Sequence, residues 1–140
     1  MITKLQDFKL LKENYKDELK LISLIKAYLL EAHDYDTWEE FIDSQEMGDC
    51  QGIVADIIDE YSDLANTFGH KLVKCFGHIK IDEPVWVESM NDYNDLFTHH
   101  WVKFNDNILD FSKGTLKDYI EWNSLYTVGD GMDDDKYEEL

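Results

Sequence analysis

The segment DCQGIVADIIDEYSDLANTFGHKLVKCFGHIKI, residues 49–81, contains the change of pattern that decides the fold. In its first part apolar residues recur three or four positions apart, which predicts a helix from about residue 49 to 67 that stops before Gly69. Beyond Gly69 the apolar residues gather in two short runs, Leu72–Phe76 and His78–Ile81. These runs predict one or two strands, interrupted by a bulge at the glycine between them.

The residues before this segment predict more helices, and those after it predict strands. Apolar residues recur at helical spacing from about Asn14 to Ala32, and Asp36 is suited to cap a shorter helix that reaches about Gln45. Downstream we expect a short strand, the two strands of a hairpin and a closing helix, over residues 85–87, 97–104, 108–111 and 116–122. The acidic tail from Asp130 is expected to be frayed.

Helices followed by an antiparallel sheet predict an α+β fold, with the N-terminal helices and the helix that begins near Asp49 packed on a small antiparallel sheet. The length of 140 residues suits a single domain. Its expected parts are a helical N-terminal part, a core, a C-terminal helix or strand and an acidic tail: residues 1–47, 48–112, 113–129 and 130–140.

The chain is strongly acidic. Its 13 basic residues are all lysines and it has 31 acidic residues, so the formal net charge is −18. This charge argues against direct binding of nucleic acid and against docking on anionic membranes. It favours a basic partner, and rows of carboxylates can also mimic the phosphates of a nucleic acid.

The cysteine content and the N-terminus predict a cytoplasmic protein. The two cysteines, Cys50 and Cys75, form neither a disulfide framework nor a CxxC metal motif, and the first seven residues lack the apolar run of a secretory signal. The most apolar stretch, Leu19–Leu30, is interrupted by charged residues and does not suit a membrane span. We therefore expect reduced thiols, no metal and no cofactor.

Cys50 is the first candidate for chemistry, because it lies in the first turn of a predicted helix. The positive end of the helix dipole and the unpaired backbone N–H groups there favour a thiolate and can hold a developing oxyanion. Asp49 acts in the opposite direction, so the thiol needs a cationic or hydrogen-bonding partner. Cys75, in the middle of a predicted strand, is expected to act as a small buried apolar residue.

The hairpin at residues 97–111 offers that partner. A nucleophilic cysteine needs an imidazole base, and the imidazole needs a carboxylate or amide that fixes its tautomer. A two-residue turn at Asn105-Asp106 would place Asp110 on the face of His99, whereas a three-residue turn would place it on the face of His100. The residues alone leave both histidines open as the base.

Four short motifs resemble those of the papain-like and transglutaminase-like cysteine superfamily, in particular its small phage and bacterial members. They are Gly48-Asp49-Cys50 at the start of a helix, Phe76-Gly77-His78 at the end of a strand, the H-x-W-V motif His99-His100-Trp101-Val102, and Ile108-Leu109-Asp110, which opens a D-x-S strand. The resemblance covers about residues 48–112.

This resemblance implies a role for each site residue. Cys50 is the expected nucleophile, and His99 rather than His100 is the expected base, since the imidazole occupies the first position of the H-x-W motif. Asp110 is the expected orienting acid. Gln45 lies near the place of the oxyanion glutamine of the superfamily. Gln51 directly follows Cys50, at a position where the superfamily often has an aromatic residue, and is the second oxyanion candidate.

The sequence therefore predicts a small cysteine hydrolase or acyltransferase that acts on amide or thioester bonds of a protein or peptide substrate, with basic substrates favoured by the charge. The alternative is a non-catalytic acidic inhibitor that mimics nucleic acid and blocks a basic nucleic-acid-binding protein, as a phage counter-defence protein would. A third interpretation is a degenerate member of the superfamily that has kept the core and lost the chemistry.

Overall fold

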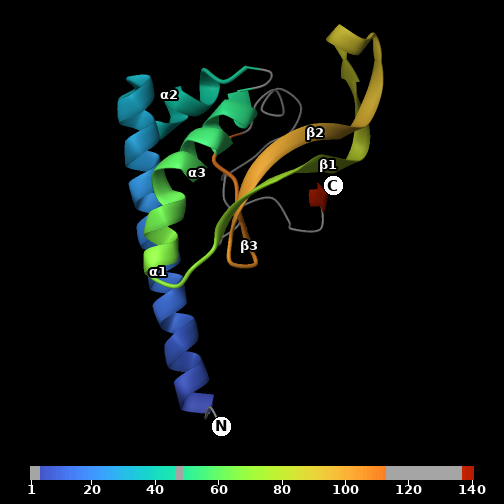
Figure 1. Cartoon of the computed structure of the whole chain (residues 1–140). Coiled ribbons are helices and arrows are strands. Elements are labelled where there is room, and N and C mark those ends of the chain that lie inside the picture. Colours follow the sequence, from blue (N-terminus) through green and yellow to red (C-terminus); the bar gives the residue numbers. More distant parts are fainter. Residues whose placement is uncertain (1–3, 47–48, 113–136) are drawn as a thin grey trace. The chain divides into compact units, whose positions relative to one another are not determined.

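The computed structural model describes residues 4–46, 49–112 and 137–140 (Figure 1). These residues form an α+β fold with one four-stranded antiparallel sheet in the order β3-β2-β1-β4, so the predicted fold class is confirmed. The helices are α1 (Lys4–His33), α2 (Trp38–Asp43) and α3 (Asp49–Thr67), and the strands are β1 (Leu72–Val87), β2 (Asp92–Phe104), β3 (Asn107–Leu109) and β4 (Tyr137–Glu139).

The chain divides into two compact units, Met1–Phe41 and Ile42–Leu140. In the first unit, rings of His33, Tyr35 and Trp38 surround Phe41, with centroid distances of 5.3, 6.1 and 4.9 Å. The expected N-cap at Asp36 is wrong. Thr37 is the N-cap instead: its hydroxyl Oγ1 accepts a hydrogen bond from the backbone N–H of Glu40 at 3.2 Å and so caps the start of α2.

In the second unit α3 packs against β1 and β2 (Figure 1). The buried residues of α3 follow the helical spacing that the sequence shows, namely Cys50, Ile53, Val54, Ile57 and Ala65. The helix ends where expected, because Gly69 adopts a φ of +81°, a left-handed conformation that glycine accepts without steric cost.

β1 is longer and more regular than the sequence predicts. It runs through Gly77 without a break in register, so the interruption expected there is wrong; the irregularity lies between Lys80 and Val85. The segment Val85–Val87 is the far end of the same strand, which turns through a short 3-10 helix, Glu88–Met90, into β2. Across this end of the hairpin Trp86 and Tyr93 meet edge to face at 5.3 Å.

The turn between β2 and β3 decides which side chains share a face. Phe104 pairs with Asn107 and Val102 with Leu109, so the turn has two residues, the shorter of the two alternatives. Asn105 in this turn has a φ of +55°, which asparagine tolerates better than most residues. The same register, continued by one residue, places Asp110 opposite Trp101 and on the face of His99.

The C-terminal residues contribute a strand. Tyr137, Glu138 and Glu139 pair with Ile79, His78 and Gly77 of β1, so the expectation of a frayed tail is wrong for these residues. Lys103 anchors the strand, since its Nζ lies 2.9 Å from Oε2 of Glu139. The helix expected at 116–122 lies outside the described residues.

The approach of β4 explains why position 77 is glycine. A Cβ at this position would collide with the backbone carbonyl of Glu138 and would lie 2.9 Å from the ring of Trp101. Glycine is therefore required for packing, although its φ is not positive.

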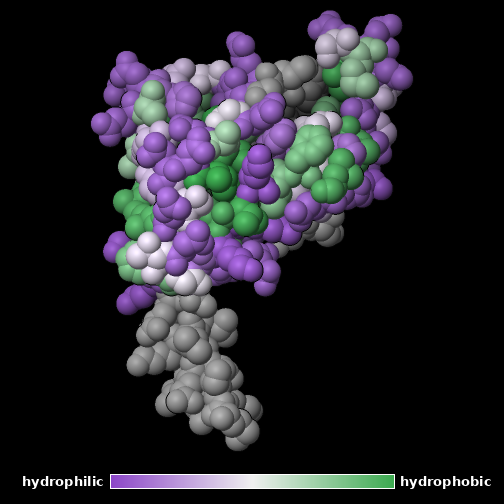
Figure 2. Space-filling view, in the orientation of Figure 1, coloured by the Kyte–Doolittle hydropathy of each residue, from purple (hydrophilic) through white to green (hydrophobic). Residues whose placement is uncertain are grey.

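Hydrophilic side chains cover much of the surface in the view of Figure 2, and apolar side chains gather over β1 and β2. The exposed large apolar residues of these two strands are Val73, Phe76, Trp86, Tyr93 and Leu96. None of the helices in the described part of the chain is both long and apolar enough to cross a membrane.

Candidate active site

α3 places Cys50 in its first turn, where backbone N–H groups have no partner within the helix. The side chain is buried, with 7% of the residue exposed. Asp49, which the sequence suggests would oppose a thiolate, turns back along the chain: its Oδ2 accepts a hydrogen bond from the backbone N–H of Glu46 at 2.7 Å. The Asp49 carboxylate is therefore engaged in a hydrogen bond with the backbone just before α3.

The sheet brings His99 and Asp110 together. Nε2 of His99, on β2, lies 2.8 Å from Oδ2 of Asp110, which directly follows β3, and each residue is only 1% exposed. A buried pair of this kind fixes the orientation of the imidazole and, when the ring is protonated, forms a charge-assisted hydrogen bond.

His99 also interacts with Cys50. Burial by itself lowers the pKa of the imidazole, but the charge and hydrogen bond of Asp110, together with a hydrogen bond and charge at Cys50, outweigh burial and raise it from 6.5 to about 10. Because Nε2 faces Asp110, Nδ1 is the nitrogen that remains for the thiol. His99 therefore interacts with Cys50 on one side and with Asp110 on the other.

Two further groups hold the carboxylate of Asp110. The backbone N–H of Ser112 donates to Oδ1 at 3.2 Å, and the hydroxyl of Tyr137 donates to Oδ2 at 2.7 Å. Aspartate side chains commonly accept a hydrogen bond from the backbone N–H two residues later, in a short turn. The bond from Ser112 is of this kind, so the D-x-S motif could have indicated it. Nothing in the local sequence pointed to Tyr137.

His100, the alternative base, faces the other side of the sheet. Its ring packs against that of Phe76, with centroids 4.8 Å apart. Burial lowers the pKa of His100, and the nearby positive charges of His99 and Lys74 lower it further. His99, and not His100, makes the hydrogen bond to Asp110. The structure therefore distinguishes the two histidines that the sequence left as alternatives.

The two oxyanion candidates lie in different environments. Gln45 is only 2% exposed, and its Oε1 accepts a hydrogen bond from the hydroxyl of Ser112 at 2.8 Å. Gln45 is therefore tied to the strand end that carries Asp110. Gln51 is exposed on the surface of α3.

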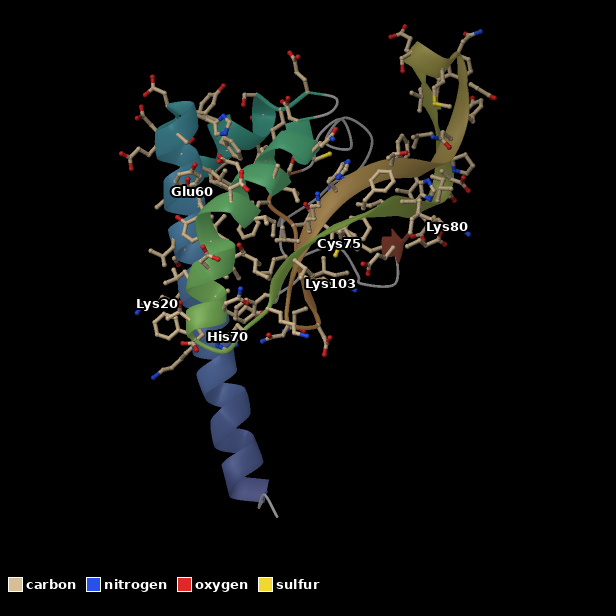
Figure 3. All side chains as sticks on the ribbon, viewed as in Figure 1. Lys20, Glu60, His70, Cys75, Lys80 and Lys103 are labelled. Atoms are coloured by element: carbon tan, nitrogen blue, oxygen red, sulfur yellow. The ribbon has the colours of Figure 1, made fainter. Side chains whose placement is uncertain are left out.

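Cys75 lies in a different setting from Cys50. It belongs to a buried cluster with Trp101 and Ile108 in the sheet, close to Lys103 (Figure 3). Burial, and next the negative charge of Glu139, raise the pKa of the Cys75 thiol from 9.0 to about 11. This thiol stays protonated at neutral pH, as expected for a small buried apolar residue.

The described residues contain no group of three or more His, Cys, Asp or Glu side chains arranged to hold a metal ion. No protein-family model, curated protein or solved structure matches the chain. The site itself consists of the Cys50 thiol at a helix N-terminus, the His99 ring beside it and the buried Asp110 carboxylate behind the ring.

Proposed function

We propose that this protein is a small cysteine-dependent hydrolase or acyltransferase that acts on amide or thioester bonds. The observation that carries the proposal is the position of His99, which interacts with the thiol of Cys50 and is held at 2.8 Å by Asp110. This is the arrangement that nucleophilic catalysis by cysteine requires: a nucleophile, a base and a group that orients the base.

In the first half-reaction His99 takes the proton of the Cys50 thiol, the resulting thiolate attacks the substrate carbonyl, and the carbonyl π electrons move to the oxygen. The backbone N–H groups at the start of α3 hold this oxyanion, with Gln45 as the side-chain candidate and Gln51 as the second. The tetrahedral intermediate then collapses: the bond to the leaving amine or thiol breaks, and His99 gives its proton to that group. The product is an acyl-thioester of Cys50.

The surroundings of His99 assist this proton transfer. The negative charge on Cys50 is one of the influences that raise the pKa of the imidazole. When Sγ forms its covalent bond that charge disappears, so the imidazolium becomes a stronger acid as the leaving group needs the proton. In the second half-reaction His99 removes a proton from water or from another acceptor, which attacks the thioester and releases Cys50.

The remaining features favour a macromolecular substrate. The net charge of −18 attracts basic segments of a protein or peptide and repels nucleic acid. The mechanism uses side chains and backbone groups of the chain alone, without a cofactor. It also needs a reduced Cys50, which the predicted cytoplasmic location would maintain.

The reactivity of the two thiols tests this proposal. The rate of modification by methyl methanethiosulfonate, a small thiol-reactive reagent, is measured at Cys50 and Cys75 by mass spectrometry from pH 5 to 9. We expect Cys50 to react well below the ordinary thiol pKa of about 8.5. His99→Ala should move this profile to that of an ordinary thiol, whereas the matched variant His100→Ala should leave it unchanged.

The same set of proteins is then incubated with p-nitrophenyl acetate. The wild type should release p-nitrophenolate and carry an acetyl group on Cys50, and Cys50→Ala should do neither. Circular dichroism verifies that each variant is folded. A folded wild-type protein whose Cys50 has an ordinary pH profile, or whose profile is insensitive to His99→Ala, would show that the proposal is wrong.

The charge of the chain favours one second candidate, an acidic inhibitor that occupies the nucleic-acid site of a basic protein. Binding of this kind weakens steeply as salt rises, because it depends on many screened charge pairs. It would also be unaffected by Cys50→Ala. A basic partner captured by both the wild type and Cys50→Ala, and released by salt alone, would favour this candidate over the enzyme.

A further inference from the structure

Tyr137 reaches the candidate active site from the far end of the chain. Its hydroxyl donates to Oδ2 of Asp110 at 2.7 Å, and Nε2 of His99 lies 2.8 Å from the same oxygen. The other oxygen of this carboxylate accepts the N–H of Ser112. One carboxylate oxygen is thus shared by two donors, a phenol and an imidazole.

The position of Tyr137 is set by packing rather than by the hydrogen bond alone. Its ring meets that of Trp101 edge to face, with centroids 5.0 Å apart, and packs on the buried cluster around Cys75. Backbone pairing with Ile79 and the ion pair of Lys103 with Glu139 hold the strand around it. The hydroxyl is therefore presented to Asp110 by a ring that is fixed on two sides.

We propose that Tyr137 is a positioning residue that sets the geometry and the proton affinity of the His99–Asp110 pair. The inference rests on the proposed function and extends the site from three side chains to four. A hydrogen-bond donor on Oδ2 withdraws part of the carboxylate charge from the imidazolium, and it also restrains the rotation of the carboxyl group. Both effects act on the reaction through His99 and not on the substrate.

A definite sign follows for the loss of the hydroxyl. In Tyr137→Phe the ring and its packing remain, but Oδ2 of Asp110 has one donor fewer. Its charge then acts more fully on His99, so the imidazole holds its proton to higher pH. Only the part of the free energy of this hydrogen bond that differs between the protonated and the neutral imidazole shifts the midpoint of the His99 titration, so the expected shift is at most about one pH unit.

The other titratable groups around His99 come from each neighbouring element. Cys50 interacts with it from α3 and Asp110 from the end of β3, and Tyr137 of β4 acts on it through Asp110. His100, its neighbour on β2, lies on the other face with Phe76. On β1 the residue paired with His99 is Gly77, which has no side chain. Tyr137→Phe alters one member of this set and leaves the others in place.

The test follows His99 by nuclear magnetic resonance in the full chain, with Cys50→Ala in every sample so that thiol titration does not interfere. The imidazole carbon signal is titrated from pH 6 to 11, and the Nε2 proton bonded to Asp110 is observed at low field; His99→Ala assigns both signals. Tyr137→Phe should move the midpoint upward and shift the low-field proton. The matched control Glu138→Gln, which alters an exposed side chain of the same strand, should change neither.

Two outcomes would overturn the inference. One is a titration midpoint and a low-field proton that are the same in Tyr137→Phe as in the parent protein, and the other is an equal change in Glu138→Gln. The measurement also separates the inference from the proposed function. If the His99 signals respond to Tyr137→Phe but Cys50 of the wild type is unreactive, only the proposed enzymatic function is contradicted. A reactive Cys50 with an indifferent Tyr137→Phe would contradict only the role of Tyr137.

Discussion

Replacing Asp110 with Asn should change how the free energy of unfolding depends on pH. In the folded protein the pKa of His99 is raised from 6.5 to about 10. A group whose pKa is higher in the folded state stabilises the fold fully below its unfolded value and loses this effect as pH rises toward the folded value. The stabilisation by His99 is therefore complete below pH 6.5 and declines up to about pH 10.

The size of the change follows from proton linkage. One proton bound by the folded state and not by the unfolded state changes stability by about 1.4 kcal/mol per pH unit, or about 2 to 3 kcal/mol between pH 7 and 9. In Asp110→Asn the largest influence that raises the pKa of His99 is absent, and burial lowers it instead. The variant should be less stable than the wild type at pH 7, and the difference should narrow by this amount at pH 9.

Urea unfolding at pH 6.5, 7, 8 and 9, followed by tryptophan fluorescence in the presence of a reductant, measures this difference. The series stops at pH 9 because Cys75, with a pKa raised from 9.0 to about 11, destabilises the fold above that pH in both proteins. Asp106→Asn, an exposed carboxylate in the same hairpin, is the control and should parallel the wild type. Parallel curves for Asp110→Asn and the wild type would refute the reasoning.

Three further predictions concern packing and reactivity. Gly77→Ala should lower the free energy of unfolding by about 2 kcal/mol or more, because its Cβ runs into the backbone of β4; unchanged urea unfolding would contradict this packing. Cys75 should react with thiol reagents at pH 7 at least about 100-fold more slowly than Cys50 in the native protein and at a similar rate in 8 M urea, as its raised pKa implies; equal native rates would be inconsistent with its burial. Ser112→Ala should lose the hydrogen bond from the hydroxyl to Gln45, while the bond from its backbone N–H to the Asp110 carboxylate persists. The free energy of unfolding in urea should fall by about 1 to 2 kcal/mol. A loss of Cys50 reactivity without a loss of stability would show that the hydroxyl acts in another way.

Much of the second unit could be predicted because its signals are local. The spacing of apolar residues specified α3, Gly69 specified its end, and the position of Cys50 in the first turn followed from both. The start of α2 was less predictable, since Asp36 and Thr37 are both good N-caps and only the backbone geometry selects Thr37.

The choice between His99 and His100 shows where local signals stop. A turn of two residues or of three is compatible with Asn105-Asp106-Asn107, and a change of one residue moves every side chain to the opposite face. Only the observed pairing of Phe104 with Asn107 places Asp110 on the His99 face. The preference for His99 before that point came from the H-x-W resemblance.

The sequence by itself determined α3, the strand-forming segments after it, the acidic charge and the candidates for nucleophilic chemistry, which are Cys50, Asp110 and either of two histidines. Periodicity and residue chemistry are properties of neighbours along the chain, so these features are visible without the fold. Tertiary structure alone decided that Gly77 is required by the approach of β4 and that Tyr137 donates to Asp110. Both depend on strand pairing between residues about sixty positions apart, and such long-range pairing leaves no periodic pattern in either segment.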